Sequence, residues 1–150
     1  MSPKKTIPNA IFFASVEEII AEGRSVEMVV RGVSMRPFLR DGKDVVVLSP
    51  LPAEGVSVGM VVLFRHRGSH VLHRLVAIGP EGLIFEGDGN YRLQERATAD
   101  SVVAYVSEVR KSGGLRLAYK SLAWRVWSAV CLCRKCLRRV AIDVKRTIKR

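Results

Sequence analysis

Cysteine is nearly absent from the sequence, and its placement excludes a disulfide-stabilised body. Cys131, Cys133 and Cys136 fall within six residues, and no other cysteine occurs among the 150 residues. They cannot cross-link the rest of the chain, which fits a reducing compartment. C-x-C-x-x-C could bind a soft metal, but a tetrahedral site needs a fourth ligand, and no further cysteine or histidine lies nearby. We therefore expect core-facing or acylatable cysteines, no metal site and no cofactor.

Long hydrophobic runs and targeting segments are also missing. No uninterrupted apolar run approaches the ~18 residues of a membrane-spanning helix. The start of the chain, "MSPKKTIPNAIFFASVEEII", has a short apolar patch, but Glu17 and Glu18 follow it and no small-residue cleavage site ends it. The sequence thus predicts no spanning anchor, no signal peptide and a cytoplasmic chain. "GDGN" lacks the lysine and the helix start that a phosphate-binding loop needs.

The net charge of +11 belongs to one end of the chain. From residue 110 onward, 13 Lys and Arg residues stand against Asp143 alone, which gives +12. The rest carries 12 basic and 13 acidic side chains, which gives −1. The body therefore lacks the basic excess of a nucleic-acid-binding domain, and nucleic acid is disfavoured as a partner. The excess positive charge is therefore informative only about what the C-terminal segment from residue 110 onward binds.

Short β-branched segments are what the chain has in abundance. Its 48% hydrophobic and 26% charged residues fit a globular protein of one domain. Segments rich in valine and aromatic residues, separated by glycine and proline turns, predict strands. These segments are "SVEMVVR", "KDVVVLS", "MVVLFRH", "HVLHRLVAI", "LIFEGD" and "SVVAYVSEVR". Short strands at turn-separated spacing predict a mostly β (α+β) fold, with a coiled antiparallel sheet over residues 25–112.

Helical spacing appears at the two ends of the chain. Apolar residues from Ile11 to Ile20 recur at helical intervals, which predicts a helix over residues 10–22, capped by Asn9, in an N-terminal arm of residues 1–24. A longer helix is predicted over residues 117–150. At ~100° per residue its apolar positions form one stripe opposite a Lys/Arg face. The stripe comprises Leu122, Val126, Ala129, Val130, Cys133, Leu137, Val140, Val144 and Ile148.

This basic amphipathic helix has three candidate roles. Helices of this kind lie in the headgroup plane of anionic membranes, which would make the protein peripheral on the inner face of the membrane. Alternatively, Leu122, Val126, Leu137 and Val140 pack on the β-domain and the basic face is simply solvated. RNA binding is a weaker third option, because few aromatic residues are interleaved with the basic ones.

Two residues could carry nucleophilic chemistry. Ser34 lies between Gly32 and Pro37, and a catalytic serine needs such an exposed turn and a base within reach. The alternative is that Ser34 only satisfies the backbone of that turn. In "HVLHRLVAI" strand alternation puts His73 on an otherwise apolar face. Burial disfavours the protonated ring, so such a histidine can accept a proton. A core histidine bonded to a carbonyl would show the same pattern.

Four segments follow one another between residues 26 and 110: "GVSMRPFLRDG", "GMVVLFR", "VLHRLVAI" and "FEGDGN". Together they resemble the signal-peptidase and repressor-type serine peptidase clan (S24/S26). Its patterns are G-x-S-M-x-P-x-L-x-x-G-D, G-D-(I/V)-V-x-F, H-R-V-(I/V) and K-G-D-x-N. Because His73 stands where many members have lysine, the chain is most similar to the branch with a Ser-His arrangement.

The resemblance implies a serine endopeptidase that cleaves a precursor or leader peptide. Ser34 would attack the scissile carbonyl, His73 would be the base, and backbone N–H groups of Ser34 and Met35 would hold the oxyanion. Asp88 in "EGDGN" would be the third catalytic member, or else an Asx-type turn residue. The substrate would be an extended peptide along a strand edge, with small residues before the cut.

The sequence also departs from the family pattern. Met60 replaces an aspartate, and Leu93 and Gln94 stand where the Ser-His branch usually has an acidic pair. These departures keep open a catalytically silent peptide-binding module of the same fold. A self-cleaving regulator is a further alternative, although residues 1–33 contain no Ala-Gly or Cys-Gly cleavage site. The pattern makes no prediction of oligomeric state.

Overall fold

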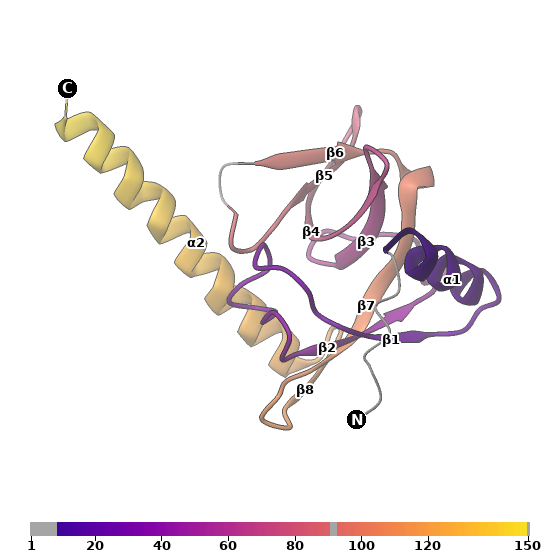
Figure 1. Cartoon of the computed structure of the whole chain (residues 1–150). Helices are drawn as coiled ribbons and strands as arrows, with labels where there is room; N and C mark the ends of the chain where they lie inside the picture. The colour runs from indigo at the N-terminus through magenta and orange to yellow at the C-terminus, as the bar shows by residue number, and fades with distance from the viewer. Residues whose placement is uncertain (1–8, 91–92, 150) are drawn as a thin grey trace.

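Eight strands form one antiparallel sheet in the computed structural model, which describes residues 9–90 and 93–149 (Figure 1). The strand order is β1-β2-β7-β3-β4-β5-β6, and β8 pairs with the free part of β7. The strands are β1 (Val26–Val29), β2 (Val45–Ser49), β3 (Val61–His66), β4 (Ser69–Gly79), β5 (Gly82–Glu86), β6 (Gln94–Ala97), β7 (Val102–Arg110) and β8 (Arg116–Ala118). A 3-10 turn, η1 (Ala99–Ser101), precedes β7.

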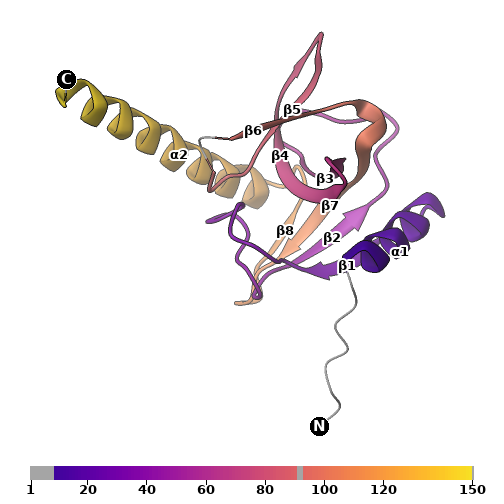
Figure 2. The ribbon, with the colours of Figure 1, turned by 45° about the horizontal axis from the view of Figure 1, so that its top comes forward.

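The sheet curls into a half-barrel, which Figure 2 shows in the path from β3 to β6. The register shifts at three places, between Val47 and Leu48, between Leu63 and Phe64, and between Leu75 and Ala77. Such irregularities bend a strand and increase its twist, so they favour this curvature. β6 forms one edge of the sheet, next to β5, and the curl turns this edge back toward β4.

Two apolar clusters hold the structure together. Inside the curl, Phe64 on β3 stacks on Phe85 on β5 with ring centroids 4.0 Å apart, and buried residues such as Leu75 pack around them. The larger cluster joins β2 and β7 to the helices, where Phe38 meets Trp124 edge to face at 5.0 Å. The second cluster therefore ties the chain's C-terminal helix to the loop that carries Ser34.

One helix lies at each end of the described chain. In α1 (Asn9–Ala21), Val16 and Ile20 are buried against the sheet. In α2 (Leu122–Ile148), the hydroxyl of Ser121 accepts a hydrogen bond from the N–H of Trp124 and so caps the first turn. Figure 1 shows α2 docked on the domain at its start and projecting beyond it. Neither of these two described helices combines the length and the apolar character needed to cross a membrane.

The mostly β, coiled antiparallel prediction is confirmed, and all six predicted strands are present. Two short strands, β6 and β8, were missed. The predicted start of the second helix at residue 117 is wrong, because Leu117 is buried in β8 opposite Val109 and the helix begins at Leu122. Residues 1–8 of the predicted arm and Arg150 of the predicted helix lie outside the described residues.

Candidate active site

The loop between β1 and β2 carries Ser34 and is closed by its own backbone. The N–H of Gly42 donates to the carbonyl of Val30 at 2.7 Å, and the Asp41 carboxylate accepts from the N–H of Gly32 at 2.9 Å. Met35, directly after the serine, is buried, whereas Ser34 is half-buried. The buried side chain of Met35 thus holds the loop against the core, and Ser34 lies at the edge of the core.

The "GDGN" segment after β5 packs against this loop. The N–H of Gly89 donates to the carbonyl of Ser34 at 2.8 Å. A Cβ on Gly87 would lie 2.5 Å from that carbonyl oxygen and 3.1 Å from Nε2 of His73. No side chain fits there, so glycine is required for the close approach of the two segments. The position that a Cβ of Gly87 would take is thus flanked by the carbonyl oxygen of Ser34 and by Nε2 of His73.

His73 is held by a carboxylate that sequence reasoning missed. Its Nδ1 lies 2.8 Å from Oε2 of Glu95, and both side chains are buried. An ionised carboxylate only accepts hydrogen bonds, so in the neutral ring Nδ1 carries the proton and Nε2 remains an acceptor. The arrangement therefore fixes the tautomer that a general base requires and directs its free nitrogen to the Ser34 side.

Ser34, His73 and Glu95 line one cavity of about 320 Å³. Among the hydrogen bonds of residues 9–90 and 93–149, none engages the Ser34 hydroxyl or Nε2 of His73. In the same residues, the backbone N–H groups of Ser34 and Met35 donate to no protein acceptor. The Ser34 hydroxyl, Nε2 of His73 and the N–H groups of Ser34 and Met35 thus have no hydrogen-bond partner among the described residues.

The position of Glu95 follows from strand register. Leu75 on β4 lies opposite Phe85 on β5, and Phe85 lies opposite Glu95 on β6, so these three side chains share one face of the sheet. His73 projects to that face because it lies two residues before Leu75. The curl of the sheet then closes the remaining distance. The sequence contains one hint of this role, because Glu95 is the single acidic residue of "QERA" and directly follows Gln94.

Asp88 is placed elsewhere, and its prediction as the third member is corrected. Its two carboxylate oxygens accept from Nε and Nη2 of Arg74 at 2.8 and 2.7 Å. Adjacent residues of a strand point to opposite faces, so Arg74 carries its partner away from the face of His73. Arg74 also donates to the carbonyl of Gly59 at 2.9 Å and lies 4.6 Å from the ring centroid of Phe38. Asp88 therefore fastens the "GDGN" segment instead of orienting the histidine.

A second acid of this region, Glu86, ties α2 to the site. It accepts from Lys135 and Arg139 at 2.6 Å each, and from Gln94 at 2.7 Å. Burial alone would raise the pKa of Glu86, but these hydrogen bonds outweigh it and hold the pKa below its ordinary value. Lys135 also donates to the carbonyl of Gly87 at 3.1 Å. The helix thus buttresses the glycine that touches both Ser34 and His73.

A larger apolar cavity of about 430 Å³ adjoins the Ser34 cavity, with which it shares Arg31, His70 and Leu72. Phe12 and Phe13 of α1 form one wall, and Met28 of β1 forms another. Among the described strands β1 pairs only with β2, which makes it an edge strand of the described sheet. An edge strand beside an apolar cavity can accept an extended peptide and one of its side chains.

Neither a metal-binding cluster among the described residues nor a match to a known protein adds to this description. Within the described part of the chain, no group of three or more His, Cys, Asp or Glu residues is arranged to hold a metal ion. Cys131 is buried, whereas Cys133 and Cys136 are exposed. Comparisons with protein-family models, curated proteins and solved structures returned no match. The function is therefore inferred from the geometry of the site itself.

Proposed function

We propose that the protein is a serine endopeptidase of the S24/S26 type, with Ser34 as nucleophile and His73 as general base. The observation that carries the proposal is the buried His73–Glu95 pair, whose remaining ring nitrogen lies beside the Ser34 backbone in a shared cavity. Acyl-transfer enzymes use the same three groups: a serine, an imidazole, and a carboxylate that is hydrogen-bonded to Nδ1 of the imidazole. Glu95 replaces Asp88 as the third member.

Each group has a step in the reaction. Nε2 of His73 takes the Ser34 proton as Oγ attacks the peptide carbonyl, and Glu95 stabilises the imidazolium that forms. The N–H groups of Ser34 and Met35 bind the oxyanion. His73 returns the proton to the leaving amine, which leaves an acyl group on Ser34. Water deprotonated by His73 then attacks this ester and releases the acid.

The substrate of this proposal is an extended peptide of a precursor protein. The peptide would pair with β1, an edge strand of the described sheet that leads directly into the Ser34 loop. The apolar cavity against α1 accepts one of its side chains. The expectation of small residues before the cut remains part of the family resemblance.

The test is hydrolysis of a mixed extended-peptide library by the purified full chain, read by mass spectrometry. Ser34→Ala and His73→Ala should abolish cleavage, because one removes the nucleophile and the other removes the base. His66→Ala should cleave normally, since His66 lies outside both cavities. Cleavage by Ser34→Ala at the wild-type rate contradicts the proposal. Peptide binding without cleavage by any variant supports a catalytically silent module.

A further inference from the structure

Helix α2 docks on the domain through a narrow face that carries both apolar and polar residues. Its buried residues are Trp124, Ser128, Cys131 and Lys135, which are spaced as neighbours on one side of a helix. Trp124 packs on Phe38, the Ser128 hydroxyl accepts from Arg74 at 3.3 Å, and Lys135 binds Glu86. These contacts fix the rotation of the helix about its axis relative to the sheet.

That rotation turns the apolar stripe away from the domain. At ~100° per residue the stripe is centred almost opposite the docked face. Its large members are 51% to 78% exposed, so the alternative in which they pack on the β-domain is wrong. These members are Leu122, Val126, Val130, Leu137, Val140, Val144 and Ile148. Seven apolar side chains along one face of a helix of 27 residues form an unusually large exposed patch.

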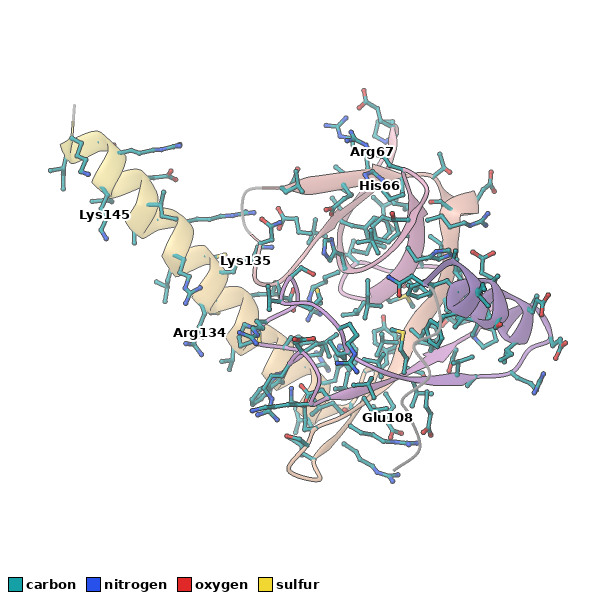
Figure 3. All side chains as sticks on the ribbon, viewed as in Figure 1. His66, Arg67, Glu108, Arg134, Lys135 and Lys145 are labelled. Atoms are coloured by element: carbon teal, nitrogen blue, oxygen red, sulfur yellow. The ribbon has the colours of Figure 1, made fainter. Side chains whose placement is uncertain are left out.

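Basic residues border the stripe on both sides. At helical spacing, Arg134 and Lys145 lie along one border, and Arg125 lies along the other together with Asp143. Figure 3 shows Lys135 on the side of α2 toward the strands and Arg134 on the side away from them. Lys135 and Arg139 are occupied by Glu86, whereas Arg125, Arg134 and Lys145 lie beside the stripe.

We infer that the apolar stripe of α2 binds the surface of an anionic lipid bilayer, with the β-domain carried on the opposite face of the helix. An apolar stripe flanked by cations matches the boundary between acyl chains and acidic headgroups. The charge disfavours a second copy of the chain, because α2 has seven Lys and Arg residues against Asp143 and two such helices would repel. Nucleic acid would leave the apolar residues uncovered in water.

The inference does not depend on the proposed peptidase activity, and neither does its test. The full chain is sedimented with phosphatidylglycerol/phosphatidylcholine vesicles and with phosphatidylcholine vesicles alone. The apolar variant is Leu137→Glu with Val140→Glu, and its control is Ile78→Glu, an exposed apolar residue on β4. The charge variant is Arg134→Glu with Lys145→Glu, and its control is Arg96→Glu on β6. Substitutions are preferable to truncation because Trp124 belongs to the core.

The wild type should sediment with the acidic vesicles and much less with the neutral ones. Both double variants should lower the partition coefficient by about tenfold or more, and added salt should weaken wild-type binding. Ile78→Glu and Arg96→Glu should bind like the wild type. Equal binding by all variants, or no binding to acidic vesicles, overturns the inference. A dimer in sedimentation velocity that Leu137→Glu with Val140→Glu dissociates, without vesicle binding, would instead assign the stripe to a second copy.

Discussion

Removal of the Asp88 carboxylate should destabilise the fold strongly, because it leaves a buried guanidinium without its counter-charge. The side chains of Arg74 and Asp88 are 2% and 1% exposed and share two hydrogen bonds of 2.8 and 2.7 Å. Breaking a buried pair from one side costs about 3–5 kcal/mol. For a chain of this size that loss lowers the midpoint of thermal unfolding by roughly 10 °C. We therefore expect Asp88→Ala to show this shift.

Urea denaturation and calorimetry measure the effect directly. The matched control is Glu81→Ala, which removes an acid paired with Arg96 at 2.6 Å on the surface, where the side chains are 79% and 64% exposed. Exposed pairs contribute little, so this variant should unfold like the wild type. The double variant Arg74→Met with Asp88→Leu should recover much of the lost stability, because apolar residues replace buried pairs at low cost. An unchanged free energy of unfolding in Asp88→Ala would refute a stabilising role for the buried Arg74–Asp88 ion pair.

Two amide variants, Glu95→Gln and Asp88→Asn, distinguish the role of Glu95 from that of Asp88. Glu95→Gln keeps an oxygen that can accept from Nδ1 of His73 but removes the charge that stabilises the imidazolium. Its fold should therefore persist, while the rate of Ser34 acylation falls by roughly a hundredfold. If Asp88→Asn slows acylation more than Glu95→Gln does, and both remain folded, then the assignment of Glu95 is incorrect.

Two further predictions concern acid stability and thiol reactivity. Because hydrogen bonds hold the pKa of Glu86 below its ordinary value near 4.5, its contribution to stability is complete above that pH and is lost as the pH falls through the lower folded-state value. Glu86→Gln should thus unfold more easily at neutral pH and lose less stability on acidification, and identical pH profiles in urea titrations would contradict this. Burial raises the pKa of the Cys131 thiol to about 11, so a disulfide reagent at mildly alkaline pH should modify Cys133 and Cys136 first and Cys131 only after unfolding. Simultaneous modification of all three would contradict the buried position of Cys131.

Much of the fold could be read from local pattern, and the exceptions have physical reasons. Alternation and turn residues identify long strands such as β4, where the period of two repeats several times. β6 and β8 are too short for that signal, and each forms because a neighbouring strand supplies its hydrogen bonds. Leu117 reads as the start of a helix, yet burial opposite Val109 places it in a strand.

The site was predictable only where its residues lie in motifs. Ser34 stands out in the sequence because it lies in a turn between Gly32 and Pro37. His73 stands out because it lies on an otherwise apolar strand face. The choice between Asp88 and Glu95 depends on which face of β4 each acid reaches, and that follows from the register of three strands and the curl of the sheet. The stripe of α2 was likewise visible in the sequence. Its exposure was not, because it depends on the contacts of Trp124 and Lys135 on the opposite face.

The most direct test of the central claim is covalent labelling of the purified chain by a fluorophosphonate, with the modified residue located by peptide mapping. This reagent reacts with a serine whose hydroxyl is activated by a base and whose oxyanion is stabilised. If Ser34 is the nucleophile and His73 its base, one adduct forms, on Ser34. It is absent in Ser34→Ala and forms far more slowly in His73→Ala. No adduct on the folded wild-type chain, or an adduct on another serine that persists in Ser34→Ala, would contradict it.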